Sequence, residues 1–359
     1  MAMENLKGLV LSGGRGTRLR PITHTSAKQL VPVANKPVLY YGLEAMAAAG
    51  IEEVGIIIAP ETGETIQEAT GDGERFGLRI TYIEQEEPLG LAHAVLTAES
   101  FLGSDPFVMY LGDNLLKDGI SALVESFKRS EPDALILLAH VLEPSLYGVA
   151  ELDGDRVVHL IEKPDDPPSD LALVGVYMFT PEILDAARSI EPSGRNELEI
   201  TDAIQVLIDR GLRVEPHVVS GWWKDTGRLE DILEANRLIL EDIQTRIDGE
   251  LVEAQVEGRV VIERGARLER TVVRGPAIIG AGSNIVDAYI GPYSAIDENV
   301  SIERAEIEYS IVMADSAISD LAARMEASLI GRNVSLRRNH ALPRAYRFMV
   351  GDNSEIQIL

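Results

Sequence analysis

The chain has 359 residues, with 33 Lys or Arg, 58 Asp or Glu and no Cys, so its formal net charge is −25. This charge excludes the broad positive surface that binds nucleic acid or an anionic membrane, and the lack of cysteine excludes disulfides and thiolate chemistry. With 45% hydrophobic residues, no apolar run of about 18 residues and no signal-peptide pattern, the sequence is typical of a cytoplasmic globular protein of two domains.

Short apolar runs alternate with longer amphipathic segments over residues 1–245, which is the pattern of an α/β domain. Val, Ile and Leu dominate the short runs, so we expect a Rossmann-like, mostly parallel sheet covered on both faces. The runs predict strands over 8–12, 53–59, 78–83, 107–111, 134–140 and 214–219. Helical spacing of apolar residues predicts helices over 38–49, 91–101, 119–130, 201–210 and 229–246.

A glycine-rich turn follows the first predicted strand, in the stretch from Leu11 to Arg18. Its three glycines allow backbone N–H groups to point at an anion without interference from a Cβ atom. The glycine spacing matches neither the P-loop nor the dinucleotide-binding fingerprint, and a turn of this kind also serves simply to reverse the chain. A second cation, Lys28, follows in an apolar segment and favours a phosphate site.

Two aspartates are candidates for a metal site. Asp113 follows the predicted strand 107–111, at the carboxyl edge of the sheet where α/β proteins bind ligands, and Asp225 lies in a later loop. Two carboxylates together with substrate phosphates form a typical Mg²⁺ site. Taken alone, either aspartate is more simply explained as a turn or helix-capping residue.

From residue 246 onward the sequence repeats every 17 residues. One column contains Ile262, Ile279, Ile296, Met313 and Ile330; a second contains Ala266, Ser283, Val300, Ala317 and Val334. A third column of Leu268, Ile285, Ile302 and Leu336 fails only at Ser319, and Gly265, Gly282, Asn299 and Asn333 stand where a turn needs positive φ. This pattern predicts a β-helix with stacked apolar columns, and an irregular β-sandwich with chance spacing is the alternative.

Several motifs spread over residues 6–240 resemble those of the sugar-phosphate nucleotidylyltransferases, and within them those of glucose-1-phosphate thymidylyltransferases. They are Leu11 to Pro21, Ser26 to Pro32, Lys36-Pro37, Gln85 with Pro88 to Gly90, Leu111 to Asn114, Tyr147-Gly148, Glu162 to Pro164, Val174-Gly175 with Tyr177, Glu197 to Asp202 and Trp223 to Gly227. The repeat region resembles the left-handed β-helix of longer members. The resemblance thus implies a nucleotidyltransferase domain over 1–245 and a left-handed β-helix over 246–359.

The resemblance implies attack by a glucose-1-phosphate oxygen on the α-phosphorus of dTTP, giving dTDP-glucose and pyrophosphate, the first step of deoxysugar biosynthesis. Such a transfer needs charge neutralisation and alignment more than a protein nucleophile. Arg18 would neutralise the triphosphate, Lys28 would bridge the attacking and departing phosphates, and Lys163 would hold the sugar phosphate. Asp113 and Asp225 would bind Mg²⁺. A homo-oligomer is expected from the same resemblance.

The resemblance also implies the binding residues. Those expected to bind the nucleotide are Leu11, Gly13, Gly14, Arg15, Gly16, Thr17, Gln29, Gln85, Leu89 and Gly90. Those expected to bind the sugar phosphate are Asn114, Gly148, Glu162, Lys163 and Val174. The Gln85 amide suits O4 and N3–H of a pyrimidine, and Leu89 would lie near the thymine methyl group. Glu162 would accept a hydrogen bond from a glucose hydroxyl.

Three alternatives remain from the sequence. UTP or another hexose-1-phosphate would keep the reaction and change the substrate; an acetyltransferase activity in the β-helix would use His340 as its base; a non-catalytic scaffold would keep only the fold. The other histidines, His93 among them, show no spacing that indicates a catalytic or metal site. The segment from Glu197 to Asp202 is equally well explained as a helix start with Thr201 as the N-cap.

Overall fold

The computed structural model describes residues 5–14, 16–24, 26–339, 350 and 354–357. Its contacts divide the chain into two compact units. The first consists of Met1–Gly16, Ser26–Leu30 and Val38–Asp225, and the second of Thr17–Thr25, Val31–Pro37 and Thr226–Leu359. No helix among the described residues is both long and apolar enough to span a bilayer. The boundary expected at residue 245 stays a prediction.

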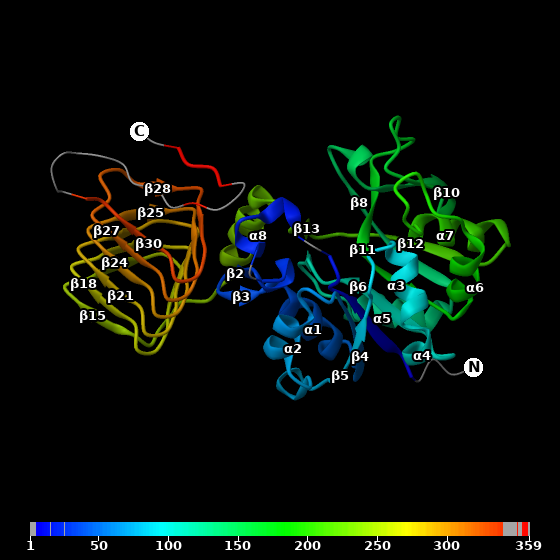
Figure 1. Cartoon of the computed structure of the whole chain (residues 1–359), viewed down its shortest axis with the longest axis horizontal. Coiled ribbons are helices and arrows are strands. Elements are labelled where there is room, and N and C mark those ends of the chain that lie inside the picture. Colours follow the sequence, from blue (N-terminus) through cyan, green and yellow to red (C-terminus); the bar gives the residue numbers. More distant parts are fainter. Residues whose placement is uncertain (1–4, 15, 25, 340–349, 351–353, 358–359) are drawn as a thin grey trace. The chain divides into compact units, whose positions relative to one another are not determined.

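A nine-stranded, mostly parallel sheet forms the first unit (Figure 1). Its main path runs β10-β9-β11-β6-β1-β4-β5, in which β6, β1, β4 and β5 are parallel. Strand β11 is antiparallel to β6. It also pairs with β8 outside this path, and β8 pairs with β12. The strands are β1 (Lys7–Leu11), β4 (Glu53–Ile58), β5 (Arg79–Glu84), β6 (Phe107–Leu111), β8 (Ala134–His140), β9 (Gly148–Asp153), β10 (Arg156–Glu162), β11 (Leu171–Phe179) and β12 (Val214–Val218). The predicted α/β class is confirmed, although β9, β10 and β11 were not predicted.

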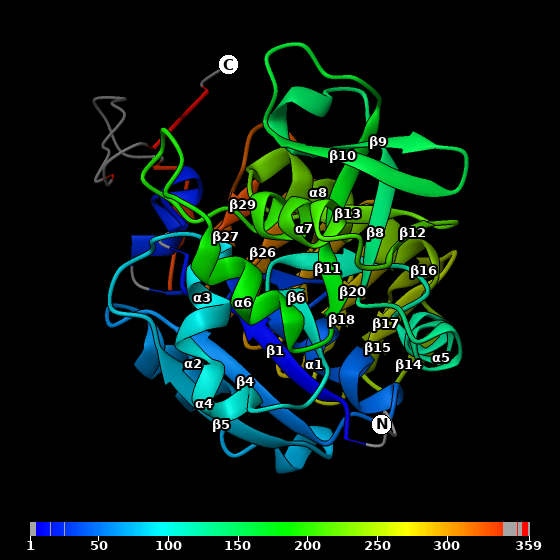
Figure 2. The same ribbon diagram turned by 90° about the vertical axis from the view of Figure 1, so that its right-hand side faces the viewer.

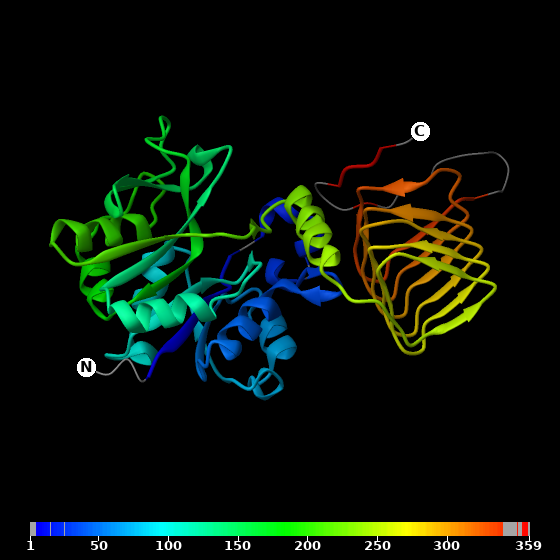
Figure 3. The ribbon, with the colours of Figure 1, turned by 180° about the vertical axis from the view of Figure 1, so that it is seen from behind.

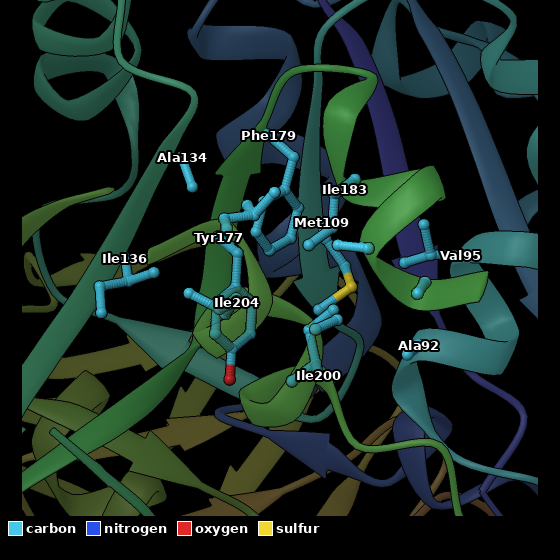
Figure 4. Close-up of a cluster of buried hydrophobic side chains, with 14 of the residues drawn as sticks. Ala92, Val95, Met109, Ala134, Ile136, Tyr177, Phe179, Ile183, Ile200 and Ile204 are labelled. Atoms are coloured by element: carbon cyan, nitrogen blue, oxygen red, sulfur yellow. The ribbon is translucent and has the colours of Figure 1, made fainter. Parts of the chain in front are cut away.

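Helices cover both faces of this sheet. They are α1 (Val38–Ala48), α2 (Gly63–Thr70), α3 (Leu91–Thr97), α4 (Glu99–Leu102), α5 (Ser121–Ser130), α6 (Glu182–Ser189) and α7 (Ile200–Asp209). One core cluster joins the sheet to α3, α6 and α7, which lie on one face (Figures 2 and 4), and a second joins it to α1, α2 and α5. Successive residues of β1 alternate between them, because Leu9 and Leu11 lie in the first cluster and Val10 in the second.

Residues 246–337 form a left-handed β-helix (Figure 3). Its successive coils stack on one another and contribute strands to three parallel sheets. The first sheet has β14 (Arg246–Ile247), β17 (Val260–Ile262), β20 (Ala277–Ile279), β23 (Ser294–Ile296), β26 (Ile311–Val312) and β29 (Leu329–Ile330). The second has β15 (Glu250–Val252), β18 (Arg267–Glu269), β21 (Asn284–Val286), β24 (Ser301–Glu303), β27 (Ala317–Ser319) and β30 (Ser335–Arg337). The third has β16 (Gln255–Glu257), β19 (Val272–Arg274), β22 (Tyr289–Ile290), β25 (Glu306–Glu308) and β28 (Met325–Glu326).

The 17-residue period is confirmed through Ile296 and is wrong after it. Ile296 pairs with Val312, 16 residues on, and Val312 pairs with Ile330, 18 residues on. Val312 rather than Met313 therefore occupies the apolar column. One short coil followed by one long coil restores the phase, which is why Ile330 still fell on the predicted period.

The same shift corrects the other two columns. Ile318 pairs with Ile302 and Leu336 and is buried, so the apparent failure at Ser319 is a displacement by one residue. Ser316 is buried, whereas Ala317 is exposed, so Ala317 was wrongly assigned to its column. The turn residues predicted to have positive φ are confirmed, with values of 85° at Gly265, 70° at Gly282, 56° at Asn299 and 57° at Asn333.

A tight hairpin packs with the β-helix inside the second unit. Strands β2 (Pro32–Val33) and β3 (Lys36–Pro37) are joined by Ala34 and Asn35, both with positive φ, as a two-residue hairpin turn requires. The Asn35 side chain donates to the Ile296 carbonyl over 2.6 Å. The turn, which follows Lys28 closely in the chain, is therefore anchored by the β-helix.

Helix α8 (Leu229–Glu241) supplies the second anchor of this hairpin. It ends five residues before Arg246, where β14 begins, so the helix predicted over 229–246 was too long. The fully buried Asn236 accepts a hydrogen bond from the Ala34 N–H over 2.9 Å and donates one to the Tyr293 carbonyl over 2.9 Å. One asparagine thus ties the hairpin to a coil of the β-helix.

Candidate active site

The glycine-rich turn lies against two side chains of the predicted site. A Cβ atom on Gly13 would lie 3.3 Å from Gln85 Oε1, and one on Gly14 would lie 3.1 Å from Lys28 Cε. Gly16 has a φ of 60°, a backbone conformation that residues with a side chain rarely adopt. Glycine at these positions therefore lets the backbone run next to Gln85 and Lys28, as a phosphate-binding turn requires.

Lys28 and Asp113 form an ion pair that is largely shielded from solvent. Lys28 begins a 3-10 helix, η3 (Lys28–Leu30), and its ammonium contacts Asp113 Oδ2. Burial alone would raise the pKa of Asp113, but the Lys28 ammonium and hydrogen bonds from Lys28 and Asn114 lower it below its usual range. Asp113 is therefore a carboxylate at neutral pH.

A short antiparallel ladder connects the segments that carry the two predicted metal aspartates. Strands β7 (Asn114–Leu116) and β13 (Trp223–Asp225) pair antiparallel, and Asp225 faces Asn114, the residue after Asp113. Asn114 donates to Asp113 Oδ1 over 3.1 Å and accepts a hydrogen bond from Trp223 Nε1. The ladder thus places Asp225 beside the residue that follows Asp113, although the two segments are far apart in the chain.

The donor set at Asp113 and Asp225 fits Mg²⁺. Both donors are carboxylates, and Asp113 already pairs with a cation, the Lys28 ammonium. In the part of the chain that the structure describes, no group of three or more His, Asp or Glu side chains is placed to hold a metal ion. Two carboxylates leave positions for water and substrate phosphate, which is the incomplete protein shell that Mg²⁺ prefers.

Gln85 lies beside Gly13 of the glycine-rich turn, and Gly90 lies next to Gln85. Gln85 follows β5 and is nearly buried; its Nε2 atom lies 2.8 Å from His93 Nδ1 and 3.5 Å from the Gly90 carbonyl. Gly90 has a φ of 106°, and a Cβ atom there would lie 2.4 Å from the Leu198 carbonyl oxygen. Only glycine fits this turn, because the backbone of Leu198 crosses it and bonds to Leu89.

Leu11 and Gln29 lie under the site. The Leu11 carbonyl accepts a hydrogen bond from Gly112 N–H over 2.9 Å, and its side chain belongs to the core. Gln29 is also buried, beside Gly112, and its Oε1 atom has no hydrogen-bond partner, as is the case for Ser12 Oγ. The Leu11 side chain therefore packs in the core below the turn.

Glu162 forms the centre of a polar cluster on the predicted sugar side. It accepts hydrogen bonds from Arg195 Nη2 over 3.0 Å and from Thr201 Oγ1 over 3.3 Å. A Cβ atom on Gly148 would lie 2.7 Å from Thr201 Cγ2 and 3.1 Å from Glu162 Oε2, so glycine lets the backbone pass close to this carboxylate. Burial and the neighbouring Glu199 raise the pKa of Glu162, against the lowering effect of Lys163, Arg195 and Thr201.

Lys163 lies beside Glu162, whereas Val174 lies in the core. Lys163 has a φ of 43°, an uncommon conformation for a side-chain-bearing residue, which its N–H bond to the Tyr147 carbonyl holds. Its ammonium lies 3.7 Å from Glu162 and is half exposed. Val174 is fully buried in the core between sheet and helices, so only its backbone is available to a ligand.

The remaining predicted residues lie elsewhere. Thr17 and Arg18 begin the 3-10 helix η1 (Thr17–Leu19), which belongs to the second compact unit. Arg15 and His340 lie outside the described residues. The structure thus brings together Gly13, Gly14, Lys28, Gln85, Asp113, Asn114 and Asp225 along the carboxyl edge of the sheet, with Gly148, Glu162 and Lys163 in a cluster of their own.

Two residues of the site were missed by sequence reasoning. Arg195 contacts Glu162, Glu197 at 3.4 Å and Glu199 at 2.8 Å, and so fixes the carboxylate of Glu162. The N-cap of α7 is Glu199, so the alternative that made Thr201 the cap is wrong; Thr201 instead bonds to Glu162. His93 is the other missed residue, and no spacing in the sequence indicated that it would meet Gln85.

Several known proteins are similar to this chain in sequence and in fold. The family described as nucleotidyl transferase matches residues 7–242. A glucose-1-phosphate thymidylyltransferase from Streptomyces antibioticus is 58% identical over 356 residues, covering 98% of this chain and 99% of that protein. One from Streptomyces griseus is 53% identical over 355 residues, covering 98% and 99%. The crystal structure of a Bacillus anthracis protein described as a glucose-1-phosphate thymidylyltransferase, in complex with sucrose, has a TM-score of 0.63 and 34% identity, covering 67% of this chain and 97% of that one.

Proposed function

Because the chain belongs to the nucleotidyl transferase family, and within it to the glucose-1-phosphate thymidylyltransferases, we propose that it transfers a thymidylyl group from dTTP to glucose-1-phosphate. A phosphate oxygen of the sugar phosphate forms a bond to the α-phosphorus of dTTP. The bond from that phosphorus to the bridging oxygen breaks, and pyrophosphate leaves with the electron pair. The products are dTDP-glucose and pyrophosphate.

The observation that carries this proposal is the position of Lys28. Its side chain runs past Gly14 and ends on the Asp113 carboxylate. A triphosphate held by the N–H groups of Gly13 and Gly14 would therefore meet a fixed ammonium group next to the carboxylate edge. A preorganised cation at this point stabilises the charge that shifts from the attacking to the departing phosphate. Arg18 adds charge neutralisation, and Arg15 contributes to triphosphate binding.

Asp113 and Asp225 would hold Mg²⁺. When bound, the ion neutralises phosphate charge and orients the two substrates. Asn114 orients the Asp113 carboxylate through the bond to Oδ1, and Trp223 in turn fixes the Asn114 amide. These contacts hold the Asp113 carboxylate in one orientation.

The two ends of the site select the substrates. Gln85, with Leu89 and Gly90, binds the pyrimidine, and Thr17 and Gln29 complete the nucleotide site. Glu162 accepts a glucose hydroxyl, Gly148, Asn114 and Val174 line the sugar, and Lys163 holds its phosphate. The Arg195 contact to Glu162 keeps this acceptor in place. UTP remains the main competing nucleotide, because uracil presents the same N3–H and O4 groups. We place the activity in the cytoplasm and expect a homo-oligomer.

Pyrophosphate release with Mg²⁺ and glucose-1-phosphate tests this proposal. We expect dTTP to be the preferred substrate among dTTP, UTP, ATP, CTP and GTP. A matched series with galactose-1-phosphate and glucosamine-1-phosphate tests the sugar. Release confined to UTP, or to a different sugar phosphate, would keep the reaction and refute the substrate; no release from any pair would refute the function.

A further inference from the structure

We propose that His93 is a positioning residue that locks the Gln85 amide in one orientation and so makes the site selective for pyrimidines that carry an N3–H group. The inference rests on the proposed function, since it concerns how the base of the nucleotide is chosen. It starts from the hydrogen-bond partners of the Gln85 side chain. An amide presents a donor on one side and an acceptor on the other, so its orientation decides which base edge it accepts.

The orientation of the Gln85 amide is fixed from two sides. The Gly90 carbonyl lies 3.5 Å from Nε2, and a carbonyl oxygen only accepts hydrogen bonds. His93 Nδ1 lies 2.8 Å from the same Nε2 atom. Since the amide nitrogen only donates, Nδ1 must be the unprotonated, accepting nitrogen, and the His93 proton must lie on Nε2.

This arrangement leaves Oε1 of Gln85 as the group available to a ligand. Within the part of the chain that the structure describes, no group donates a hydrogen bond to Gln85 Oε1. This oxygen faces the glycine-rich turn, because a Cβ atom on Gly13 would lie 3.3 Å from it. Both N–H bonds of the amide are directed away to Gly90 and His93. Gln85 therefore offers an acceptor alone, and the expectation that its amide serves O4 and N3–H together is revised.

An accepting oxygen distinguishes the pyrimidines. Thymine and uracil have a donor at N3 and satisfy it, whereas cytosine has a lone pair at N3 and is repelled. An amide free to rotate by 180° would present Nε2 to cytosine N3 and lose the distinction. Sites that discriminate by a buried hydrogen-bonding group leave that group unpaired with the wrong ligand, which is a strong penalty.

His93 is built into a rigid element. It lies in the first turn of α3, which begins directly after Gly90, and the Leu198 carbonyl accepts the N–H of Ala92 over 3.1 Å. Leu198 also donates its own N–H to the Leu89 carbonyl over 2.7 Å. The imidazole is thereby held on a helix whose start is fixed by a neighbouring segment, as a positioning residue requires.

Three substitutions of His93 separate hydrogen bonding from packing. His93→Asn and His93→Asp place an oxygen near the position of Nδ1 and should retain the lock. His93→Leu has a similar branched shape and accepts nothing. We expect His93→Leu to lower the ratio of kcat/KM for dTTP over dCTP by about tenfold or more, through a higher KM for dTTP and a lower KM for dCTP, and to leave the ratio of dTTP to UTP unchanged.

A second histidine–glutamine pair supplies the control. His159 Nδ1 lies 3.2 Å from Gln205 Oε1, and Gln205 is oriented by the N–H of Leu160 and by Asp209. The acceptor here is the amide oxygen, so His159 must carry its proton on Nδ1. His159→Leu removes a comparable pair on the surface of β10 and should leave nucleotide selectivity unchanged.

Nitrogen NMR of the histidine rings measures directly which ring nitrogen of His93 carries the proton. We expect the Nε2–H tautomer for His93 and the Nδ1–H tautomer for His159 in the same spectrum, each assigned by its loss in the leucine variant. An Nδ1–H tautomer for His93, or an unchanged dTTP-to-dCTP ratio in His93→Leu, would overturn the proposal. If the wild-type enzyme releases pyrophosphate from neither dTTP nor UTP, the proposed function fails instead. The tautomer of His93 then remains the test of whether this residue fixes the Gln85 amide.

Discussion

The ammonium of Lys28 contacts the carboxylate of Asp113, so the predicted phosphate-bridging cation and a predicted metal ligand are paired with each other in the protein itself. They come from segments 85 residues apart in the chain. The pair gives Asp113 a counter-ion at a buried position, where an uncompensated carboxylate would be strongly disfavoured. The same pair places both groups at the end of the glycine-rich turn.

We predict that Lys28→Ala and Asp113→Asn each reduce kcat by at least about 10²-fold, because each removes charge stabilisation specific to the transition state. Since the two side chains act at one point, the double variant should lose little more than the worse single variant. Steady-state pyrophosphate release, with circular dichroism to verify folding, measures this. Fully multiplicative losses would show that the two residues act independently.

The polar cluster at Glu162 predicts that removing this charge raises the stability of the protein and lowers its activity. The raised pKa means that folded Glu162 holds its proton more tightly than the unfolded chain does, so its ionisation costs stability as pH rises through the folded pKa. Glu162→Gln removes this cost. We expect the variant to melt at a higher temperature than wild type at pH 7, with the difference shrinking as pH falls below the raised pKa, while kcat/KM drops about tenfold or more.

Glu162→Asp is the control for this variant, since it keeps the charge and should not gain stability. The prediction is checked by measuring the melting temperatures of wild type and both variants from pH 4 to pH 8. A lower melting temperature of Glu162→Gln at neutral pH would mean that the contacts with Arg195 and Thr201 outweigh the burial of the charge.

The buried Asn236 predicts a further stability effect. Asn236→Ala leaves the Ala34 N–H and the Tyr293 carbonyl without their partner, and each buried unpaired group costs about 1–3 kcal/mol. We therefore expect a loss of about 2–4 kcal/mol in the free energy of unfolding. The exposed Asn284 of β21 provides the matched control, and Asn284→Ala should change stability by less than about 0.5 kcal/mol. Equal effects of the two substitutions in urea denaturation would contradict the anchoring role.

The register of the β-helix predicts which of two neighbouring residues tolerates a polar side chain. Ile318 is buried in the apolar column, and Ser319 is not. Ile318→Asn should cost about 3 kcal/mol or more, because it removes apolar burial and buries an amide. Ser319→Asn should cost less than about 0.5 kcal/mol. The opposite ranking of the two melting temperatures would support the uninterrupted 17-residue period.

Much of this architecture follows from the sequence because its signals are local. The strand ending at Leu111 places Asp113 at the carboxyl edge of the sheet by topology alone, and the left-handed turns at Gly265 and Asn299 are demanded by the repeat. The antiparallel strands β9 and β10 were missed because polar residues interrupt them and no helix separates them. A local pattern does not identify strands of this kind.

The long-range contacts could not be predicted in this way. Arg195 meets Glu162 across 33 residues, and Ala34 meets Asn236 across 202, so no spacing signals either contact. His93 is closer to Gln85 in sequence, yet the contact depends on the turn at Gly90 and on the backbone of Leu198 that crosses it. The shift at Ile318 was hidden because a short coil and a long coil cancel.

The central claim is tested most directly by identifying the product formed from dTTP and glucose-1-phosphate with Mg²⁺, by chromatography and mass spectrometry, for wild type and for Asp113→Asn. We predict dTDP-glucose and pyrophosphate in equal amounts from the wild-type protein, and a rate at least about 10²-fold lower from the variant. No dTDP-glucose from the wild-type protein, or equal rates from both proteins, would contradict thymidylyl transfer at the site formed by Lys28 and Asp113.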